Sequence, residues 1–516
     1  MLRRSAPAES LSPLQWGWIA ILAITGFRLI ALAFAQLQLY PDESQYWVWS
    51  REFDWGYFSK PPLIAWVIAT STGLLGDTDF AIRLPSILFH AMGAAFLMFT
   101  AKDIRGGWAA LWAPLVYLTL PGIGISGLVI STDALLLPLL AAAFFMFWRL
   151  RSGAGWLTAV GFGVFAGLAF LAKYAAVYFI VGLGLAIAFD PPARRALLSP
   201  RGLVAGLILL ALLAPNLAWN AANDFATVQH TAANANWQGQ LFNFGELLDF
   251  IGGQFGVFGP LLFPALIAAV WTAWRRRTDP DWQTARLLTY FCMPPLLVVA
   301  GQAFISRAHA NWAASAYVTG TLLVLILLLQ GPAWRRGLLA ASVVTGLAFS
   351  IGVSSVAIQP SIAGSHDLTR GIRHLRAWPE TVAAIAGAAD NGAYQAIVFD
   401  NRNVFHQMQR YGGDWETPIR MWQRYAAPHN HAEAVWALQA DAVGPFLIVS
   451  GREFDRERLT ADFEGVNRLR EISISTGGHA DRRFVLYEAT GYQRIPRTAD
   501  YEAVQAAADA ARSSTD

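Results

Sequence analysis

Long apolar segments alternate with short polar loops along the first two thirds of the chain. The first segment covers about 14–39, which is enough to cross a hydrocarbon core of ~30 Å as a helix that rises ~1.5 Å per residue. The pattern predicts a polytopic α-helical membrane protein with about eleven spans. The other ten segments lie at roughly 81–101, 108–126, 134–148, 156–172, 174–189, 202–219, 254–274, 287–302, 314–329 and 337–357.

The segment 40–80 contains a shorter apolar run, from Pro61 to Gly76, that begins with two prolines. Counting it as a span would reverse the side of every later loop. We therefore expect 40–80 to form one long extracytoplasmic loop with interfacial helices. Its aromatic residues suit the headgroup level of a bilayer: Tyr46, Trp47, Trp49, Phe53, Trp55 and Tyr57.

Basic residues concentrate in alternate loops, and such clusters mark the cytoplasmic side of a membrane protein. This predicts an N-terminus inside and, with an odd number of spans, an extracytoplasmic chain after about Gln359. The first span lacks a small-residue cleavage site before Tyr40, so we expect an uncleaved signal anchor. The clusters are Lys102 with Arg105, Arg149 with Arg151, Arg194, Arg195 and Arg201, Arg275–Arg277 with Arg286, and Arg335 with Arg336.

The pattern changes near residue 360. Short apolar runs that suit strands alternate with stretches that suit helices, which is typical of a soluble α/β domain. We therefore predict a transmembrane domain over 1–359 and an extracytoplasmic α/β domain over 360–516, with a flexible tail after Tyr501. The strand-like runs are 396–399, 446–449 and 484–487, and the helix-like stretches are 379–389 and 431–440.

The composition excludes several classes of protein. Only 14% of the residues are charged and 55% are hydrophobic, whereas soluble domains are about 25% charged. A cytosolic multidomain protein, a disordered scaffold and a nucleic-acid binder with a basic face are excluded. The single cysteine, Cys292, excludes a disulfide framework and a zinc site built from cysteines. No P-loop, dinucleotide fingerprint or HExxH sequence is present, so nucleotide-driven chemistry is not expected.

Lysine occurs only at Lys60, Lys102 and Lys173, and the other basic residues are arginine. Lys102 lies in a predicted cytoplasmic loop, whereas Lys60 and Lys173 lie in predicted outer loops. An ammonium group at headgroup depth suits a lipid-linked phosphate. The alternative is that a lysine there only extends toward the water at the interface.

Carboxylates follow two predicted spans on the outer side. Asp42 and Glu43 stand at a predicted helix start, where they could cap backbone amides or, for Asp42, take a proton from an acceptor hydroxyl. Asp133 ends a Ser-Thr-Asp sequence before the next span, which by itself is also a common N-cap.

Two later outer segments carry hydrogen-bonding groups. Arg307, His309, Asn311 and Trp312 precede the span at 314–329. The loop 223–249 has a composition that suits sugar hydroxyls and ring stacking, although exposed loops are often rich in asparagine. Its polar and aromatic residues include Asp224, His230, Asn234, Asn236 and Trp237.

The sequence of residues 42–50, Asp-Glu-Ser-Gln-Tyr-Trp-Val-Trp-Ser, together with Gly-Tyr-Phe-Ser-Lys-Pro-Pro at 56–62, resembles bacterial GT-C glycosyltransferases related to protein O-mannosyltransferases. The Ser-Thr-Asp sequence at 131–133 and Leu-Ala-Lys-Tyr at 171–174 are similar to a second-loop aspartate and a lysine turn of that family. His-Ala-Asn-Trp-Ala at 309–313 resembles a segment of lipopolysaccharide galacturonosyltransferases. The resemblance covers about 1–330, and the C-terminal domain is similar in position and type to the periplasmic domain of aminoarabinose transferases.

The resemblance implies an inverting transfer of a sugar from undecaprenyl phosphate to lipid A or lipopolysaccharide at the periplasmic face of the inner membrane. It implies Asp42 as the essential acidic residue, with Glu43 beside it, and Asp133 as a second catalytic carboxylate. Lys60 matches the lysine that binds the donor phosphate. Further donor-phosphate candidates are Lys173 and Arg307, since fixed cations stabilise a phosphate leaving group. Sugar or acceptor candidates are Tyr57, His309, Asn311 and Trp312.

Ser59 departs from the pattern of aminoarabinose transferases, in which an acidic residue implicated in metal binding precedes the lysine. The sequence identifies no cofactor, and a divalent metal at this position is doubtful.

Three alternatives remain open: a protein O-glycosyltransferase of the same fold, a transporter or flippase for a lipid-linked sugar, and a binding or assembly protein. Transporters usually show repeats and ionisable groups at the bilayer midplane, whereas charges here gather in the outer loops. The expected partners are a polyprenyl-phosphate-linked sugar, membrane lipids and a lipid A, lipopolysaccharide or protein acceptor, with no nucleic acid. The sequence does not identify the sugar.

Overall fold

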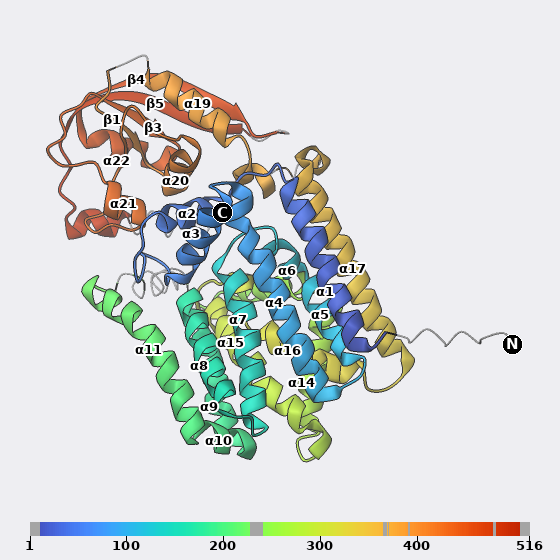
Figure 1. Ribbon diagram of the computed structural model, residues 1–516. Helices are drawn as coiled ribbons and strands as arrows, with labels where there is room; N and C mark the ends of the chain where they lie inside the picture. Colours follow the sequence, from blue (N-terminus) through green and yellow to red (C-terminus); the bar gives the residue numbers. More distant parts are fainter. Residues whose placement is uncertain are drawn as a thin grey trace. The chain divides into compact units, whose positions relative to one another are not determined.

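The computed structural model describes residues 11–225, 227, 241–364, 369, 371–390, 393–477 and 481–505. Contacts along the chain divide it into two compact units (Figure 1). Unit 1 comprises Met1–Ala33, Arg83–Leu217 and Phe242–Ser354. Unit 2 comprises Phe34–Ile82, Ala218–Leu241 and Ser355–Asp516. The predicted boundary at residue 359 divides the chain into two consecutive parts. Unit 2 differs from this prediction because it also contains two segments from before the boundary, Phe34–Ile82 and Ala218–Leu241.

Unit 1 is a bundle of helices, and each predicted apolar segment lies on one or two of them. Two of these helices, α7 and α16, are buried along most of their length and therefore form the centre of the unit. The helices with residues in this unit are α1 (Pro13–Ala33), α4 (Asp79–Arg105), α5 (Ala109–Thr119), α6 (Pro121–Ser126), α7 (Thr132–Arg151), α8 (Trp156–Ala172), η1 (Tyr174–Ala176), α9 (Val177–Phe189), α10 (Pro191–Leu197), α11 (Pro200–Ala222), α13 (Phe244–Val257), α14 (Leu262–Arg275), η2 (Pro280–Trp282), α15 (Gln283–Ile305), η3 (Ala310–Ala313), α16 (Ala316–Leu328) and α17 (Ala333–Ile358).

The lengths of the helices support a multi-pass membrane protein. Within the described residues, six helices are long and apolar enough to cross a membrane, or eight if two bent pairs each count as one span. The bent pairs are Tyr174–Phe189 with Pro191–Leu197, and Phe244–Val257 with Leu262–Arg275. The shorter apolar helices α5, α8 and α16 account for the rest of the eleven segments. The coarse prediction of a polytopic helical protein is confirmed, and the count of eleven spans stays a prediction.

Two predicted spans have a different form in the structure. The segment 108–126 is divided at Leu120, whose ψ of 133° is not helical, into α5 and α6. The segment 254–274 is not a single helix, because α13 and α14 meet at 105°. The break contains Gly259, whose φ of 106° is unfavourable for a side chain, and Pro260, which lacks the amide that a continuous helix requires. Hydropathy alone did not detect this break, because the residues on both sides of it are apolar.

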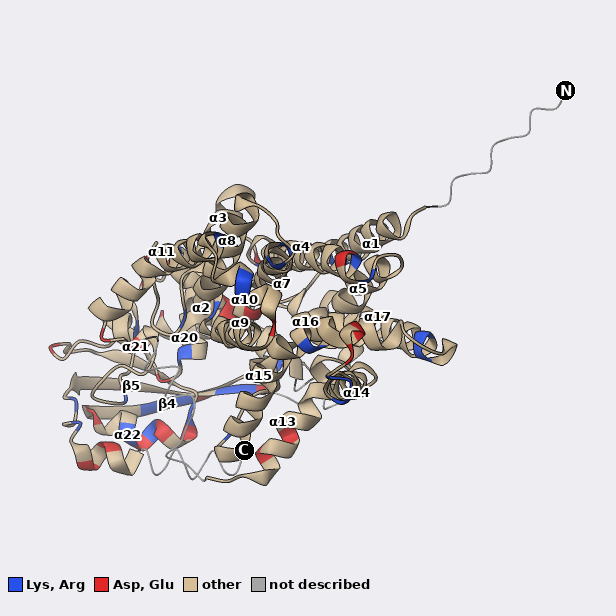
Figure 2. Ribbon diagram, turned by 90° about the horizontal axis from the view of Figure 1, so that it is seen from below, with Lys and Arg blue, Asp and Glu red and all other residues tan. Residues whose placement is uncertain are grey.

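The basic helix ends predicted to be cytoplasmic contact one another. Arg149, in the last turn of α7, lies 3.2 Å from Asp103 in α4. Arg151 makes two hydrogen bonds, of 2.9 and 2.8 Å, with the carboxylate of Asp190 at the start of α10. Figure 2 shows that most of the ribbon of the long helices carries no charged residue. These contacts place the C-terminal end of α7 among charged groups, and the orientation of the protein in a membrane stays a prediction.

Unit 2 contains a five-stranded sheet in the order β2-β1-β3-β5-β4, in which β1 is parallel to β2 and β3. β5 is antiparallel to both β3 and β4. The small C-terminal α/β domain is thus confirmed, and the three predicted strand runs all lie in strands. The strands are β1 (Ala396–Phe399), β2 (Ile419–Met421), β3 (Phe446–Ser450), β4 (Phe463–Ser475) and β5 (Asp481–Tyr492).

Helices cover both faces of this sheet, because its central strands are apolar on both sides. Ile397 and Phe399 belong to one core with α19 (Trp378–Ala389) and α20 (Arg402–Tyr411). Val398 and Phe446 belong to a second core with α22 (Arg456–Ala461). A further short helix, α21 (His431–Trp436), follows β2.

The predicted loop 40–80 contains two helices, α2 (Pro41–Ser50) and α3 (Leu63–Leu75), and is part of unit 2. α2 packs on α20, where the Ser44 hydroxyl donates a 2.9 Å hydrogen bond to Gln407. At the other end of the loop, Arg410 makes a 2.8 Å ion pair with Asp77. These contacts join the first loop to the C-terminal α/β domain.

Candidate functional site

Three of the predicted site residues meet in unit 1. The ammonium group of Lys173 lies 2.8 and 2.9 Å from the two carboxylate oxygens of Asp133. The side-chain amide of Asn311 donates a 3.1 Å hydrogen bond to the same carboxylate. The side chains of Lys173 and Asp133 keep 20% and 15% of their surface exposed, so a ligand can reach both.

The position of Asp133 is set by the start of α7. Ser131 is the N-cap of this helix, and its hydroxyl accepts a hydrogen bond from the amide of Ala134. Because Ser131 fills the capping position, the Asp133 carboxylate in the first turn is available for Lys173 and Asn311. It lies about 27 Å along the helix axis from Arg151, since α-helices rise ~1.5 Å per residue.

Lys173 occupies the short extended turn between α8 and η1, with φ −163° and ψ 134°. The next residue supports this turn, because the Tyr174 hydroxyl donates a 2.6 Å hydrogen bond to Asn216 in α11. The lysine is thus a positioned, half-buried cation, and its partner carboxylate balances its charge. An anionic ligand that approached the pair would interact with an ammonium already fixed in place.

Asn311 belongs to η3, and its neighbours in the sequence point elsewhere. The rings of His309 and Trp312 contact each other edge to face at 5.3 Å. Trp312 packs against the apolar cluster around Phe250, and Arg307 is exposed. Of the four predicted residues in this segment, Asn311 is the one with a described hydrogen bond to Asp133.

Unit 2 separates the two adjacent carboxylates of the first loop. Glu43 is fully buried, and its carboxylate accepts a 2.8 Å hydrogen bond from the amide of Tyr40 as part of a capping box. Asp42 is exposed in the first turn of α2. The structure therefore gives Glu43 a capping role and leaves the carboxylate of Asp42 open to solvent.

Lys60 lies in a tight turn, in which its amide and carbonyl exchange hydrogen bonds of 3.3 and 3.1 Å with Tyr57. The Tyr57 ring is stacked on Trp49 at 5.0 Å. Its hydroxyl donates to the carbonyls of Trp49 and Glu52, and burial raises its pKa. Tyr57 is only 5% exposed, so both its ring and its hydroxyl are largely taken up by contacts within the protein. Ser59, which precedes the lysine, is buried.

The other predictions for the outer loops have mixed outcomes. Asp224 is exposed, whereas His230, Asn234, Asn236 and Trp237 lie outside the described residues. Within the described ranges, no group of three or more His, Cys, Asp or Glu side chains is placed to hold a metal ion.

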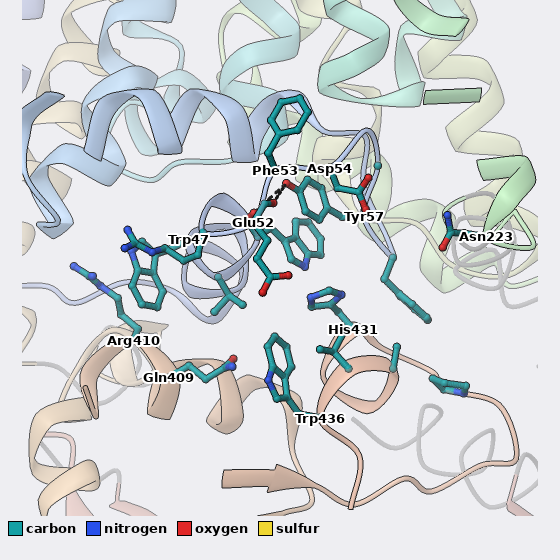
Figure 3. A pocket seen from close by; sticks show the side chains of 18 of the residues that line it. Trp47, Glu52, Phe53, Asp54, Tyr57, Asn223, Gln409, Arg410, His431 and Trp436 are labelled. Carbon is teal, nitrogen blue, oxygen red and sulfur yellow. Dashed lines mark hydrogen bonds between the residues drawn. The ribbon is translucent and has the colours of Figure 1, made fainter. Parts of the chain in front are cut away.

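Sequence reasoning missed a large cavity in unit 2, shown in Figure 3. Its volume is about 1340 Å³, and its lining comes from α2 and the loop after it, residues 219–224, α20 with the loop after it, and 427–436. The aromatic residues of 46–58 were noticeable in the sequence, and we interpreted them as an interfacial belt. Trp47, Trp49, Phe53 and Tyr57 line this cavity, and their interfacial position stays a prediction.

Comparison with known proteins identifies the family. A family model described as dolichyl-phosphate-mannose-protein mannosyltransferase matches residues 59–219. The lipid A galacturonosyltransferase RgtD of Rhizobium johnstonii is 34% identical over 484 residues, which cover 92% of this chain and 98% of that protein. The chain therefore belongs to the same family of GT-C glycosyltransferases as this relative. It is therefore a glycosyltransferase, as the first-loop motif predicted.

More distant relatives agree with this assignment. The undecaprenyl phosphate-alpha-4-amino-4-deoxy-L-arabinose arabinosyl transferase of Yersinia pestis is 28% identical over 179 residues, or 30% of this chain and 32% of that protein. Two crystal structures of ArnT from Cupriavidus metallidurans share the fold. The apo structure has a TM-score of 0.62 at 16% identity and covers 91% of this chain and 97% of that chain. The structure bound to undecaprenyl phosphate has a TM-score of 0.64 at 17% identity and covers 93% and 99%.

Proposed function

We propose that this GT-C glycosyltransferase moves a sugar from polyprenyl (undecaprenyl) phosphate to lipid A or lipopolysaccharide, with inversion, at the periplasmic face of the bacterial inner membrane. The observation that carries the proposal is the 34% identity to a lipid A galacturonosyltransferase along 98% of the length of that protein. A likeness of that extent includes the C-terminal α/β domain as well as the helices. The crystal structure of an ArnT bound to undecaprenyl phosphate supports the choice of lipid carrier.

The reaction is a single displacement at the anomeric carbon. The acceptor oxygen forms the new bond to this carbon, while the bond to the phosphate oxygen breaks and the lipid phosphate leaves with the electron pair. Negative charge grows on the leaving phosphate, so a fixed cation lowers the barrier. Lys173 fits this role because Asp133 and the turn after α8 orient its ammonium group. Lys60 and Arg307 are further donor-phosphate candidates.

Asp42 is the proposed general base. Its carboxylate is exposed, unlike that of Glu43, and could take the proton from an acceptor hydroxyl as the new bond forms. If the acceptor is a phosphate group, which already carries negative charge, Asp42 orients the acceptor instead.

The test uses the full-length protein in vesicles with a polyprenyl-phosphate sugar and lipid A. General bases contribute about 10²–10⁴-fold, so we expect Asp42→Asn to lower the transfer rate at least about 100-fold. Asp441→Asn is the matched control, because Asp441 is an exposed carboxylate outside the proposed site. Unchanged transfer in a folded Asp42→Asn protein would contradict the role of Asp42.

Protein is the second candidate acceptor, since the matching family model is described as a protein mannosyltransferase. Labelled sugar recovered in the protein fraction rather than in lipid A would favour this candidate. Mass spectrometry of lipid A from a deletion strain would identify the sugar from the mass that is lost. No change in lipid A mass would contradict the lipid A assignment.

A further inference from the structure

Apart from Tyr57, which is already a sugar or acceptor candidate, the cavity in unit 2 is lined by residues for which the proposed transfer gives no role. Neither Asp42 nor Lys60 lines it, although both belong to the same loop. A volume of about 1340 Å³ is enough for several sugar rings.

Aromatic rings form one continuous wall of this cavity. Tyr57 is stacked on Trp49 at 5.0 Å, with 9° between the planes. His431 meets Trp49 edge to face at 5.7 Å, and Trp436 meets His431 at 5.4 Å. Figure 3 shows Tyr57, His431 and Trp436 around the same space. Aromatic side chains offer apolar faces with a polar edge, which suits the C–H faces and hydroxyls of a saccharide.

The wall also contains a buried donor. The indole N–H of Trp49 has no acceptor among the described residues, although this residue is only 1% exposed. Buried polar groups in native proteins almost always have a hydrogen-bond partner. Protein atoms cover this N–H, so it is not an open hydrogen-bonding position of the cavity.

Acidic side chains also line this cavity, and two of them, Glu52 and Asp54, lie beside Tyr57 (Figure 3). The cavity is lined by five carboxylates, those of Glu52, Asp54, Asp77, Asp224 and Asp414, and by two guanidinium groups. Both of these cations, Arg51 and Arg410, pair with Asp77, at 3.5 and 2.8 Å.

The histidine in the wall does not offset this negative charge, because burial lowers the pKa of His431 to about 4 and the ring is neutral near pH 7. The field in the cavity therefore favours a neutral or cationic ligand and opposes phosphate and carboxylate groups.

We propose that this cavity is a saccharide-binding site that selects neutral or amine-bearing sugars and rejects anionic ones. Sugar rings stack on Trp436, the partly exposed end of the row of rings that includes the buried Trp49 and Tyr57. The carboxylates accept hydrogen bonds from hydroxyl or ammonium groups. In the enzyme this ligand is a part of the acceptor that lacks phosphate. That last assignment rests on the proposed function, whereas saccharide binding itself does not.

The test compares three soluble trisaccharides of equal length by calorimetric titration of the full-length protein in nanodiscs at pH 6.5. The trimers of glucosamine, N-acetylglucosamine and galacturonic acid carry positive, no and negative charge. We expect the glucosamine trimer to bind at least about tenfold more tightly than the galacturonic acid trimer, with a smaller ratio at high salt because charges are then screened. Equal or tighter binding of the galacturonic acid trimer overturns the proposal.

Variants separate the contribution of the aromatic rings from that of the carboxylates. Trp436→Ala should weaken all binding at least about tenfold, whereas Trp436→Phe keeps a ring and should keep most of it. The double variant Glu52→Gln with Asp414→Asn should reduce the preference for glucosamine, with a smaller loss for N-acetylglucosamine, whose hydroxyls can still donate to the amide oxygens. The controls are Trp108→Ala and Glu453→Gln, both exposed residues that do not line the cavity. Normal binding in Trp436→Ala, or an unchanged preference in the double variant, contradicts the proposal.

Asp42→Asn distinguishes this proposal from the proposed function. It should lose transfer and bind the trimers as the unaltered protein does. If the unaltered protein transfers no sugar to lipid A but binds the trimers in the expected order, the acceptor assignment fails and the saccharide site stands.

Discussion

The two candidate sites of this glycosyltransferase differ in how they handle charge. In unit 1, Lys173 and Asp133 form a small, neutral pair of groups that are each largely shielded from solvent. In unit 2, carboxylates outnumber cations around a wide aromatic cavity. A paired lysine offers an anionic ligand a fixed cation, while an acidic aromatic cavity suits uncharged or cationic sugar rings. On the two proposals above, different regions of the protein would bind the phosphate and the saccharide parts of its substrates.

Replacing the cation of unit 1 is expected to have the largest effect. Lys173→Ala removes the ammonium group and leaves the Asp133 carboxylate without its ion-pair partner. We expect transfer from a polyprenyl-phosphate sugar to fall about 100-fold or more, as for other groups that stabilise a developing charge. Lys173→Arg should retain part of the rate, because a guanidinium keeps the charge with a different geometry.

Initial rates at several donor concentrations measure this effect. Lys102→Ala is the matched control, because Lys102 is exposed near the C-terminal end of α4. Normal donor use by Lys173→Ala would show that the paired lysine of unit 1 is structural and would remove the contrast with unit 2.

A smaller effect is expected when the pH is lowered, and it acts on the stability of unit 2 through His431. Burial lowers the pKa of His431 to about 4, below its usual value of 6.5. The unfolded chain therefore binds the proton more readily between pH 6.5 and 4, so the free energy of unfolding falls as the pH is lowered through this range. His431→Gln removes this titration and should flatten the pH dependence by on the order of 2 kcal/mol.

Chemical unfolding monitored in the far ultraviolet between pH 7 and 4 measures this dependence. The comparison with the unaltered protein isolates His431 from the other buried groups, among them Glu433, whose pKa is raised by burial. An identical pH dependence in His431→Gln would mean that His431 is as exposed to solvent when folded as when unfolded.

The smallest effect is expected at Asn311. Asn311→Ala removes one hydrogen bond to the Asp133 carboxylate, and such a bond contributes about 1 kcal/mol, or roughly fivefold. We expect the Michaelis constant for the donor to rise by about that factor. Asn311→Asp should have a larger effect, because a second carboxylate would compete for Lys173.

Donor titrations of both variants, with the exposed Asn403→Ala as a control, test this expectation. If Asn311→Asp and Asn311→Ala have the same Michaelis constant for the donor, the charge at position 311 does not affect donor binding by Lys173.

Much of the secondary structure could be predicted from the sequence, because burial imposes a local pattern. The runs 396–399 and 446–449 are apolar on both faces, and both form central strands. β4 was missed because most of its side chains are exposed and its sequence is rich in charge. α20 was missed because its mean composition is polar, although one of its faces, with Val404, Phe405 and Met408, is buried in the domain core.

The chemistry of the site was predictable in part. The motifs at Asp42, Lys60, Asp133 and Lys173 were recognisable by residue type, and the family they indicated is confirmed. Their partners were not predictable. Ser131, rather than the acidic residue two positions later, caps α7.

The sequence by itself determined that this is a membrane-embedded GT-C glycosyltransferase with apolar helices and a C-terminal α/β domain, since hydropathy, strand patterning and short motifs are properties of neighbouring residues. Only the tertiary structure decided that Lys173 and Asn311 meet at Asp133, and that Trp49 and Trp436 line one cavity. A hydrophobic pattern shows which face of an element is buried, but the neighbour on that face depends on how all the elements pack. Lys173 and Asn311, which are 40 and 178 positions from Asp133 in the chain, reach it only through that packing.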